Sequence, residues 1–317
     1  MSSDSVSPVY IVVLNYRGVD DTIACLQSLA TLAYPDYHMI VVDNDSNDGS
    51  VQKLKAFKND FSKDFLLIES PDNNGYSAGN NLAIKHILRL QEGPKEQKEE
   101  QKEEQNAYVW ILNNDTTVEP TALTHMMQTA RDTKGLVGPL ILYPDKTYQQ
   151  VGVKINWATG SLKGYKESEL QEAMTVNALS GASMLVPLSV FKKIGLLDER
   201  YFLYCEDVEF SLRASRNNYP LSVSLKAKVY HAESASTGKT SLKTQYYHQR
   251  NRLKVLNQYA IGFEGMAIGL YSLFRLARSV VKSWFSTNPD KKASARVHLL
   301  AWQDYQQGIE GICPHQL

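Results

Sequence analysis

A run of polar side chains, Asn113 to Thr117, follows directly after AYVWIL, a stretch of large apolar and aromatic residues typical of a buried strand. The carboxylate of Asp115, flanked by amides and hydroxyls, suits a hard divalent cation that in turn holds phosphate oxygens. Ligands of open α/β sheets bind beyond the carboxyl ends of the strands, so this strand end is a candidate metal and nucleotide site. The alternative is that Asn-Asn-Asp only forms a turn.

A second acidic group, Glu206 and Asp207, follows the aromatic segment YFLYC. A carboxylate that emerges from an aromatic-lined pocket could act as general base for a hydroxyl nucleophile. Acids in a first helical turn are also stabilised by the helix dipole, so the pair could equally be structural. His231, at the end of a predicted strand, is a third candidate, although a single histidine there is more often not a ligand.

Asp43 and Asn44 end another short apolar strand. An acid at that position is well placed to accept hydrogen bonds from a nucleotide base or ribose, and a turn followed by a capped helix is the alternative. By contrast, the first turn of the chain, residues 15 to 19, lacks the glycine-rich fingerprint of NAD or FAD binding.

The segment NNGYSAGNN, residues 73 to 81, precedes a helix with an apolar face. Its small residues allow close backbone approach to a ligand, and the N-terminus of a helix favours an anion. Gly75 and Gly79 could equally serve only a turn and close helix packing.

Strand and helix signals alternate as far as residue 143, which predicts an α/β fold with a mainly parallel sheet. Asp20 or Asp21 is predicted to cap the first helix. Residues 148 to 175 indicate irregular β structure over one side of the site, and the loop 232 to 241 could close over a substrate. From Lys243 we expect helices to the end of the chain.

We therefore predict a catalytic domain over residues 1–242 and a helical region over 243–317. A charged low-complexity insert, residues 91–106, interrupts the first of these and is expected to be solvated. The helix 261–285 is apolar but carries Arg275, Arg278 and Lys282. It could lie on a membrane surface, pack on the catalytic domain or form a dimer contact.

The bulk composition excludes several classes of function. The 317 residues include 34 basic and 34 acidic side chains, so the net charge does not favour nucleic acid. Three widely spaced cysteines predict reduced thiols in a cytosolic compartment, with neither a disulfide framework nor a zinc site. We see no signal peptide and no run of about 20 apolar residues, which favours a protein that is soluble or peripheral to a membrane.

Eight segments, taken in order, resemble the inverting glycosyltransferases of family 2, which have a GT-A fold. The rhamnosyltransferase-like branch, which builds bacterial surface polysaccharides, is the most similar, and the likeness spans residues 8 to 258. The segments are VVLNYRG, VVDNDSNDGS, NNGYSAGNN, ILNNDTTVEP, SGASMLV, FLYCEDVEFSLR, VYHAESAS and YYHQRNRL.

The resemblance implies a role for each matched residue. Asp207 matches the catalytic base, with Glu206 beside it. Asp115 matches the last carboxylate of the family's Asp-x-Asp metal motif, His231 matches a contact to metal or diphosphate, and Asn113 replaces the first carboxylate with a weaker, neutral ligand. The cofactor is then Mg²⁺ or Mn²⁺. We assign the nucleotide sugar to Asn15, Asp43, Asn44, Asn74, Gly75, Asn80, Asn114 and Arg250.

The expected activity is transfer of rhamnose or a similar sugar, with inversion, from a dTDP- or UDP-sugar donor. The acceptor is expected to be a hydroxyl of a saccharide or lipid-linked saccharide. The expected process is surface polysaccharide biosynthesis. The protein is expected in the cytoplasm or peripherally at the inner face of the membrane, as a monomer or a homodimer. One alternative is a sugar nucleotidyltransferase, for which an early glycine-rich basic loop is missing. Another is a degenerate scaffold, for which Asn113 leaves room, whereas Asp115, Asp207 and His231 argue against it.

Overall fold

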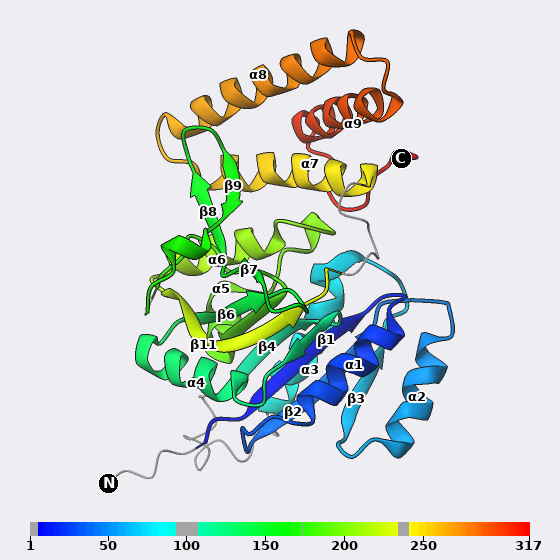
Figure 1. Cartoon of the computed structure of the whole chain (residues 1–317), viewed down its shortest axis with the longest axis vertical. Helices are drawn as coiled ribbons and strands as arrows, with labels where there is room; N and C mark the ends of the chain where they lie inside the picture. The colour runs from blue at the N-terminus through cyan, green and yellow to red at the C-terminus, as the bar shows by residue number, and fades with distance from the viewer. Residues whose placement is uncertain (1–5, 93–106, 173, 234–240) are drawn as a thin grey trace.

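A computed structural model describes residues 6–92, 107–172, 174–233 and 241–317 (Figure 1). Within these residues a mixed nine-stranded sheet forms the centre, in the order β3-β2-β1-β4-β10-β6-β11-β5, with β7 beside β6. A hairpin, β8-β9, stands apart from it. The strands are β1 Val9–Asn15, β2 Tyr37–Asp43, β3 Phe65–Glu69, β4 Tyr108–Asn113, β5 Thr116–Val118, β6 Leu136–Leu142, β7 Tyr148–Gln150, β8 Val153–Asn156, β9 Ser161–Gly164, β10 Ser183–Pro187 and β11 Leu221–His231.

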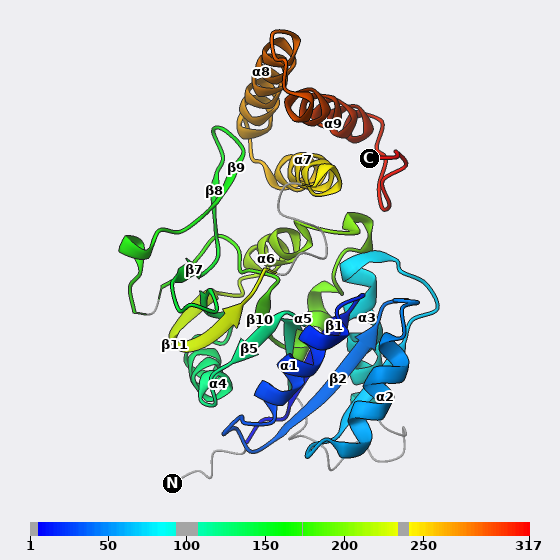
Figure 2. The same ribbon diagram turned by 45° about the vertical axis from the view of Figure 1, so that its right-hand side comes forward.

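Helices cover both faces of the sheet, and three more follow it at the C-terminal end (Figures 1 and 2). The helices are α1 Val19–Leu29, α2 Ser50–Asp60, α3 Gly75–Glu92, α4 Ala122–Thr133, α5 Leu188–Ile194, α6 Glu206–Arg216, α7 Leu242–Tyr259, α8 Glu264–Trp284 and α9 Pro289–Gln306. No helix in these described ranges is long and apolar enough to cross a membrane.

Side-chain alternation along the strands divides the core into two layers. Ile11 and Val13 of β1 join the layer covered by α1, α2 and α4, whereas Val12 joins the layer covered by α3, α5 and α6. The central strands β1 and β4 are apolar on both faces because both faces are covered. This explains the continuous apolar runs that made the strands recognisable in the sequence.

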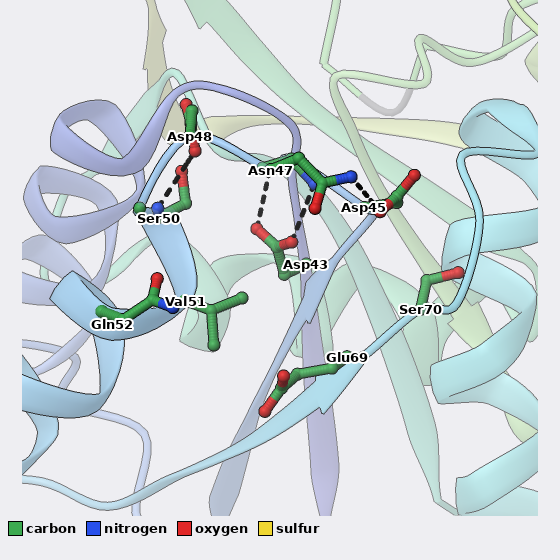
Figure 3. A pocket seen from close by; sticks show the side chains of 11 residues that line it. Asp43, Asp45, Asn47, Asp48, Ser50, Val51, Gln52, Glu69 and Ser70 are labelled. Atoms are coloured by element: carbon green, nitrogen blue, oxygen red, sulfur yellow. Dashed lines mark hydrogen bonds between the residues drawn. The ribbon is translucent and has the colours of Figure 1, made fainter.

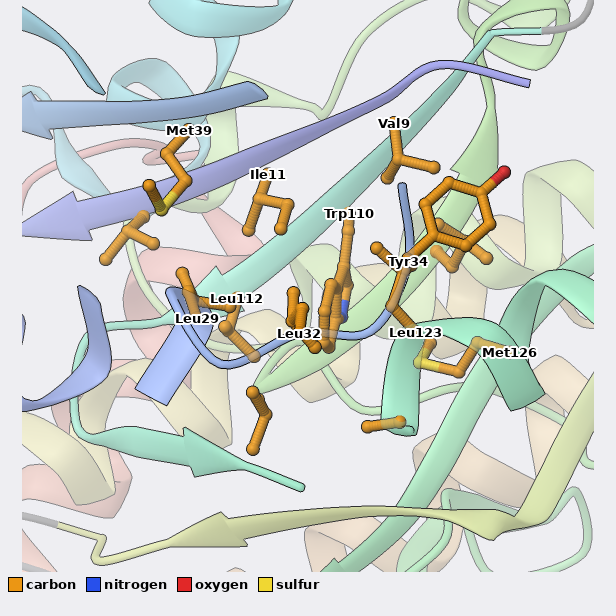
Figure 4. Close-up of a cluster of buried hydrophobic side chains, with 14 of the residues drawn as sticks. Val9, Ile11, Leu29, Leu32, Tyr34, Met39, Trp110, Leu112, Leu123 and Met126 are labelled. Carbon is orange, nitrogen blue, oxygen red and sulfur yellow. The ribbon is translucent and has the colours of Figure 1, made fainter. Parts of the chain in front are cut away.

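Trp110 of β4 lies at the centre of the first layer, among side chains of β1, α1 and α4 (Figure 4). Its indole Nε1 donates to Ser183 Oγ of β10 over 2.8 Å, so the largest buried side chain leaves no indole donor unsatisfied. Asn113, three residues further along β4, lies on the opposite side of the sheet from Trp110.

The predicted mixed sheet flanked by helices is confirmed. β3, β2, β1 and β4 are parallel, and β10 runs antiparallel between β4 and β6. In the parallel half, Asn15 pairs in register with Asp43, and Leu14 pairs with Asn113. The polar ends of three strands therefore meet at one edge of the sheet.

Two local predictions were wrong. Helix α1 begins at Val19 with Gly18 at its N-cap, because the Gly18 carbonyl accepts the first intrahelical hydrogen bond, from Thr22. Asp20 and Asp21 lie in its first turn instead, near the positive end of the helix dipole. The C-terminal helices end at Gln306, and the remaining residues turn through Gly308 and Gly311, both at positive φ. Residues 93–106 of the predicted insert lie outside the described residues. Residues 234–240 of the predicted loop also lie outside them.

Candidate functional site

Asp43, at the end of β2, is almost fully buried and is fixed by three hydrogen bonds. Asn15 Nδ2 donates to Asp43 Oδ2 over 2.6 Å, and Ser46 donates through Oγ to Oδ2 over 2.7 Å and through its backbone N–H to Oδ1 over 3.0 Å. A carboxylate offers about four lone-pair sites, so one acceptor position on Oδ1 remains for a ligand.

A chain of polar contacts links this carboxylate to β4. Thr22 Oγ1 donates to Asn15 Oδ1 over 2.7 Å, and Asn114 Nδ2 donates to Thr22 Oγ1 over 3.1 Å and to the Gly18 carbonyl over 3.0 Å. Asn15 and Asn114 thus position neighbouring strand ends through their side chains. The structure places both as supports of the site, and contact of either with the nucleotide sugar stays a prediction.

A cavity of about 460 Å³ opens beyond the ends of β2 and β3, against the start of α2 (Figure 3). Four acidic residues line it, namely Asp43, Asp45, Asp48 and Glu69. Negative charge of this density disfavours a phosphate. Uncharged groups with several hydrogen-bond donors, such as a base and a ribose, suit it better.

Two buried amide oxygens, that of Asn44 after β2 and that of Asn80 in α3, have no hydrogen-bond partner in the described part of the chain. Buried polar atoms are nearly always satisfied, so unpaired acceptors at a sheet edge indicate a place for a donor from a ligand or water. Asn74 is exposed, and its neighbour Asn73 makes the local contacts instead, accepting from Asn44 Nδ2 over 2.9 Å and from the Gly75 N–H over 3.1 Å.

Asp115 and His231 face each other across β5 and β11, with 3.2 Å between Asp115 Oδ1 and His231 Nε2. Gln149 fixes the imidazole, because its amide Nε2 donates to the His231 carbonyl over 3.1 Å and its Oε1 lies 2.9 Å from His231 Nδ1. With that amide orientation, Nδ1 carries the proton that Oε1 accepts. Nε2 is then directed toward Asp115, in the arrangement typical of metal-binding histidines.

The residues at this point fit a hard divalent cation. Asn113 Oδ1 is buried and has no hydrogen-bond partner within the described ranges, so it is available as a neutral oxygen ligand. Asp115 and His231 supply an anionic oxygen and an imidazole. Among the described residues, no three His, Cys, Asp or Glu side chains converge, so this chain would leave several coordination positions to phosphate oxygens and water.

Asp207, in the first turn of α6, is held by two backbone N–H groups. Those of Gly181 and Val208 each donate to one carboxylate oxygen over 2.8 Å. Tyr76 Oη donates to the Gly181 carbonyl over 2.7 Å and so helps to fix the backbone at Gly181, whose N–H orients Asp207. A Cβ at position 181 would lie 3.2 Å from the Asp207 Cβ, which explains the glycine there.

Glu206 and Asp207 are neighbours in a buried environment, and their surroundings affect the pKa of each carboxyl group differently. Burial, and then the charge of Asp207, raise the pKa of Glu206 from 4.5 to about 8, and Glu206 Oε2 has no hydrogen-bond partner in the described chain. Burial also raises the pKa of Asp207, but the N–H groups of Gly181 and Val208 oppose that rise. The two backbone donors therefore favour the ionised form of Asp207, whereas burial favours the protonated form of Glu206.

The loop before α6 has left-handed backbone at Phe202, Tyr204 and Cys205, with φ of 53°, 67° and 70°. Asn251 of α7 holds this strained loop, because its Nδ2 donates to the carbonyls of Tyr201, Leu203 and Tyr204 over 2.7 to 2.9 Å. Backbone strain of this kind persists only where the surrounding structure fixes it. Helix α7 is thus part of the support for Asp207.

Arg250, the neighbour of Asn251, is 1% exposed. Its guanidinium donates to the Gly311 carbonyl over 2.7 Å and to Asn251 Oδ1 over 3.0 Å, and it lies over the rings of Tyr246 and Tyr247. These contacts join α7 to the C-terminal tail. The structure does not place Arg250 in contact with Asp115 or His231, so a role at the diphosphate stays a prediction.

Several supporting residues were not singled out as site residues, although most of them lie within the segments that carry the family resemblance. Each is an ordinary polar residue or glycine whose role depends on a partner distant in sequence. These residues are Thr22, Ser46, Asn73, Tyr76, Gln149, Gly181 and Asn251.

Comparison with known proteins supports the fold and the family. The family described as glycosyl transferase family 2 matches residues 9–195, more than half of the chain. The match ends before Asp207 and His231, so those residues are placed by the structure.

Two curated relatives are each 27% identical to the chain. One is the low-salt glycan biosynthesis hexosyltransferase of Haloferax volcanii, aligned over 221 residues that make up 66% of this chain and 62% of that protein. The other is the N-acetylglucosaminyl-diphospho-decaprenol L-rhamnosyltransferase of Mycobacterium tuberculosis, aligned over 234 residues that make up 68% of this chain and 72% of that protein.

Among solved structures, a mannosyltransferase from Pyrobaculum calidifontis in complex with GDP-Man and Mn²⁺ superimposes with a TM-score of 0.59. The alignment covers 96% of this chain and 84% of that one at 13% sequence identity, a similarity that supports the GT-A fold. The chain belongs to glycosyl transferase family 2.

Proposed function

We propose that this glycosyltransferase moves rhamnose or a similar hexose from a nucleoside diphosphate sugar to a saccharide hydroxyl during surface polysaccharide assembly, with inversion at the anomeric carbon. The observation that carries the proposal is the Asp207 carboxylate, held by the N–H groups of Gly181 and Val208 at the sheet edge that also holds Asp115 and His231. That edge combines a base with a place for a charged leaving group.

The acidic cavity beside Asp43 is the proposed site of the base and ribose. Its lining carboxylates accept hydrogen bonds from ring N–H and ribose hydroxyl groups, while they repel the diphosphate. The diphosphate then lies toward β4, where the polar chain from Asn15 through Thr22 to Asn114 connects the two regions. dTDP and UDP both meet these requirements.

Asp115, His231 and Asn113 are the proposed ligands of Mg²⁺ or Mn²⁺. A divalent cation bound there would supply charge neutralisation for the departing diphosphate. Gln149 holds the His231 ring in the tautomer that directs Nε2 toward the Asp115 carboxylate. Support for this assignment also comes from the GT-A mannosyltransferase described with Mn²⁺.

Asp207 is the proposed general base. It accepts the proton of the acceptor hydroxyl as the oxygen attacks the anomeric carbon, and the bond to the diphosphate breaks on the opposite side. Because Gly181 and Val208 hold both carboxylate oxygens, Asp207 is oriented before the acceptor binds. Glu206, protonated and adjacent, does not add a second negative charge near neutral pH.

The acceptor is proposed to be a saccharide, free or linked to a lipid diphosphate. The Mycobacterium tuberculosis relative is named for an acceptor of the second kind, an N-acetylglucosaminyl-diphospho-decaprenol. The scaffold alternative predicts no turnover of any donor. Release of nucleoside diphosphate in the presence of acceptor therefore distinguishes a glycosyltransferase from a scaffold.

Thermal shift with a panel of nucleoside diphosphates and their sugars tests the donor site. Each ligand is added with Mn²⁺, Mg²⁺ or a chelator, and a ligand at 100 times its Kd should stabilise the chain by about 2.7 kcal/mol. We expect a shift for a pyrimidine nucleotide that depends on the metal. No shift for any nucleotide would argue for the scaffold.

Asp115→Ala tests the cation site within the same assay. Removal of the carboxylate should abolish the part of the nucleotide shift that requires metal, because the remaining ligands are neutral. Asp132→Ala, which changes an exposed acid on α4, is the matched control and should keep the shift. An unchanged nucleotide affinity of Asp115→Ala, with and without chelator, would contradict the assignment.

A further inference from the structure

Helix α8 exposes most of its apolar side chains. Met266, Leu270, Leu273, Phe274 and Val281 are between 47% and 64% exposed, and they recur at intervals of three, four and seven residues. Residues at this spacing share one face of a helix. The described chain therefore presents a continuous apolar stripe along a helix that is about 30 Å long.

The opposite side of α8 is firmly packed, so the exposed stripe is not a consequence of loose docking. Ile268, Ser272 and Leu276 are buried at intervals of four residues, and the helix contacts both α7 and α9. In Figures 1 and 2, α8 lies at the end of the molecule farthest from β1 and β2, with its length along the outer surface. No described element covers the stripe.

Aromatic residues mark both ends of the stripe. Phe263 precedes the helix and is 83% exposed, whereas Trp284 and Phe285 close it and are 73% and 86% exposed. Large aromatic rings favour the boundary between lipid headgroups and acyl chains.

Positive charge accompanies the apolar stripe. Residues 261–300 contain six Lys or Arg and two acids, Glu264 and Asp290. None of the six has an ion-pair partner in the described residues. Burial, and then the charge of Arg275, lower the pKa of Arg252 to about 10. The six cations are Arg275, Arg278, Lys282, Lys291, Lys292 and Arg296.

We propose that the outer face of α8, together with these cations, binds the surface of an anionic lipid bilayer. The stripe would enter the headgroup region with the helix axis along the membrane, and Arg278 and Lys282 would contact lipid phosphates. A second copy of the chain fits less well, because a twofold contact through this face would bring identical cations together. The proposal concerns the membrane surface alone and does not depend on the transfer chemistry.

Co-sedimentation of the full chain with vesicles tests the proposal. We expect binding to phosphatidylcholine vesicles that contain phosphatidylglycerol, weaker binding to phosphatidylcholine alone, and release of the protein by high salt. The double variant Arg278→Glu with Lys282→Glu should lower the affinity for anionic vesicles at least about tenfold. The double variant Phe274→Asp with Trp284→Asp should abolish binding to both.

Matched variants elsewhere on the surface control for general effects of charge and polarity. Lys192→Glu with Lys193→Glu, on exposed positions of α5, and Leu90→Asp, at an apolar position of α3 that is 56% exposed, should bind vesicles like the unaltered chain. Thermal melting confirms that every variant is folded. The same binding by the α8 variants and their controls would overturn the proposal. The proposal would also be overturned if the unaltered chain did not bind vesicles and light scattering showed a dimer that the α8 substitutions convert to a monomer.

Discussion

Two adjacent carboxylates at the start of α6 lie in surroundings that favour different protonation states. Asp207 receives a backbone N–H on each oxygen, whereas Glu206 Oε2 is buried with no partner in the described chain. The environment therefore assigns the proton to Glu206 and leaves Asp207 free to accept one. Sequence adjacency alone could not have distinguished the two roles.

Replacement of Glu206 by Gln tests this division through the pH dependence of stability. Because the folded-state pKa of Glu206 is raised from 4.5 to about 8, its contribution to stability is fully present below pH 4.5 and is lost as pH rises toward 8. A single group of this kind can change the free energy of unfolding by up to about 1.4 kcal/mol per pH unit.

Urea unfolding of both proteins between pH 5 and 9 is the measurement. As pH rises to about 8, the unaltered chain should lose unfolding free energy relative to Glu206→Gln. Above about pH 8 the difference between the two proteins should stay constant. Curves that run parallel across this range would show that Glu206 ionises normally.

At the scale of elements, the site depends on a close approach between the start of α3 and the strained loop before α6. The Tyr76 N–H donates to the Phe202 carbonyl over 2.7 Å. Gly75 has φ of 92°, and a Cβ there would lie 2.2 Å from the same carbonyl oxygen. The two segments can meet only because residue 75 has no side chain.

Gly75→Ala should therefore destabilise the chain by more than the cost of placing alanine at positive φ, because the new Cβ would also clash with the Phe202 carbonyl. Gly49 provides the matched control, since its φ is 89° and a Cβ there meets nothing within 4 Å. We expect Gly49→Ala to cost about 1 kcal/mol and Gly75→Ala at least about 2 kcal/mol in urea unfolding. Equal losses would mean that the contact with Phe202 relaxes freely.

The sequence was sufficient to predict the alternating strands and helices and the polar strand ends, because these follow from apolar periodicity and from abrupt changes to polar residues. Asp43 and Asp115 were identifiable in this way. β10 was not recognised as an antiparallel strand, since its apolar run reads like any buried segment. The Gln149 contact to His231 and the Asn251 contacts to residues 201–204 depend on long-range packing, which local patterns do not contain.

At the scale of the whole molecule, the first of the C-terminal helices, α7, contacts the elements that position Asp207. Asn251 of α7 fixes the loop before Asp207, and Tyr259 Oη of the same helix donates to Glu209 of α6 over 2.7 Å. α8 and α9 lie beyond α7 in both overall views (Figures 1 and 2). We propose that α7 belongs with the catalytic core and that the boundary lies near residue 260 instead of residue 243.

Amide hydrogen exchange tests this boundary in the intact chain. Amides in the middle of α7 should exchange as slowly as those of β1 and β4, because all three would open only in global unfolding. Amides in α8, which has one exposed face, should exchange faster. Fast exchange throughout α7 beside a slow sheet would restore the boundary at residue 243.

The most direct test of the central claim compares sugar transfer by the unaltered chain and by Asp207→Asn, with the same donor, metal and saccharide acceptor. Removal of a general base typically lowers the rate by about 100 to 10,000 fold. We predict a loss in kcat of that size with the donor Kd unchanged, since Asp207 is held by Gly181 and Val208 and does not line the cavity beside Asp43. Ordinary turnover by Asp207→Asn would remove Asp207 as the base and contradict the proposed mechanism.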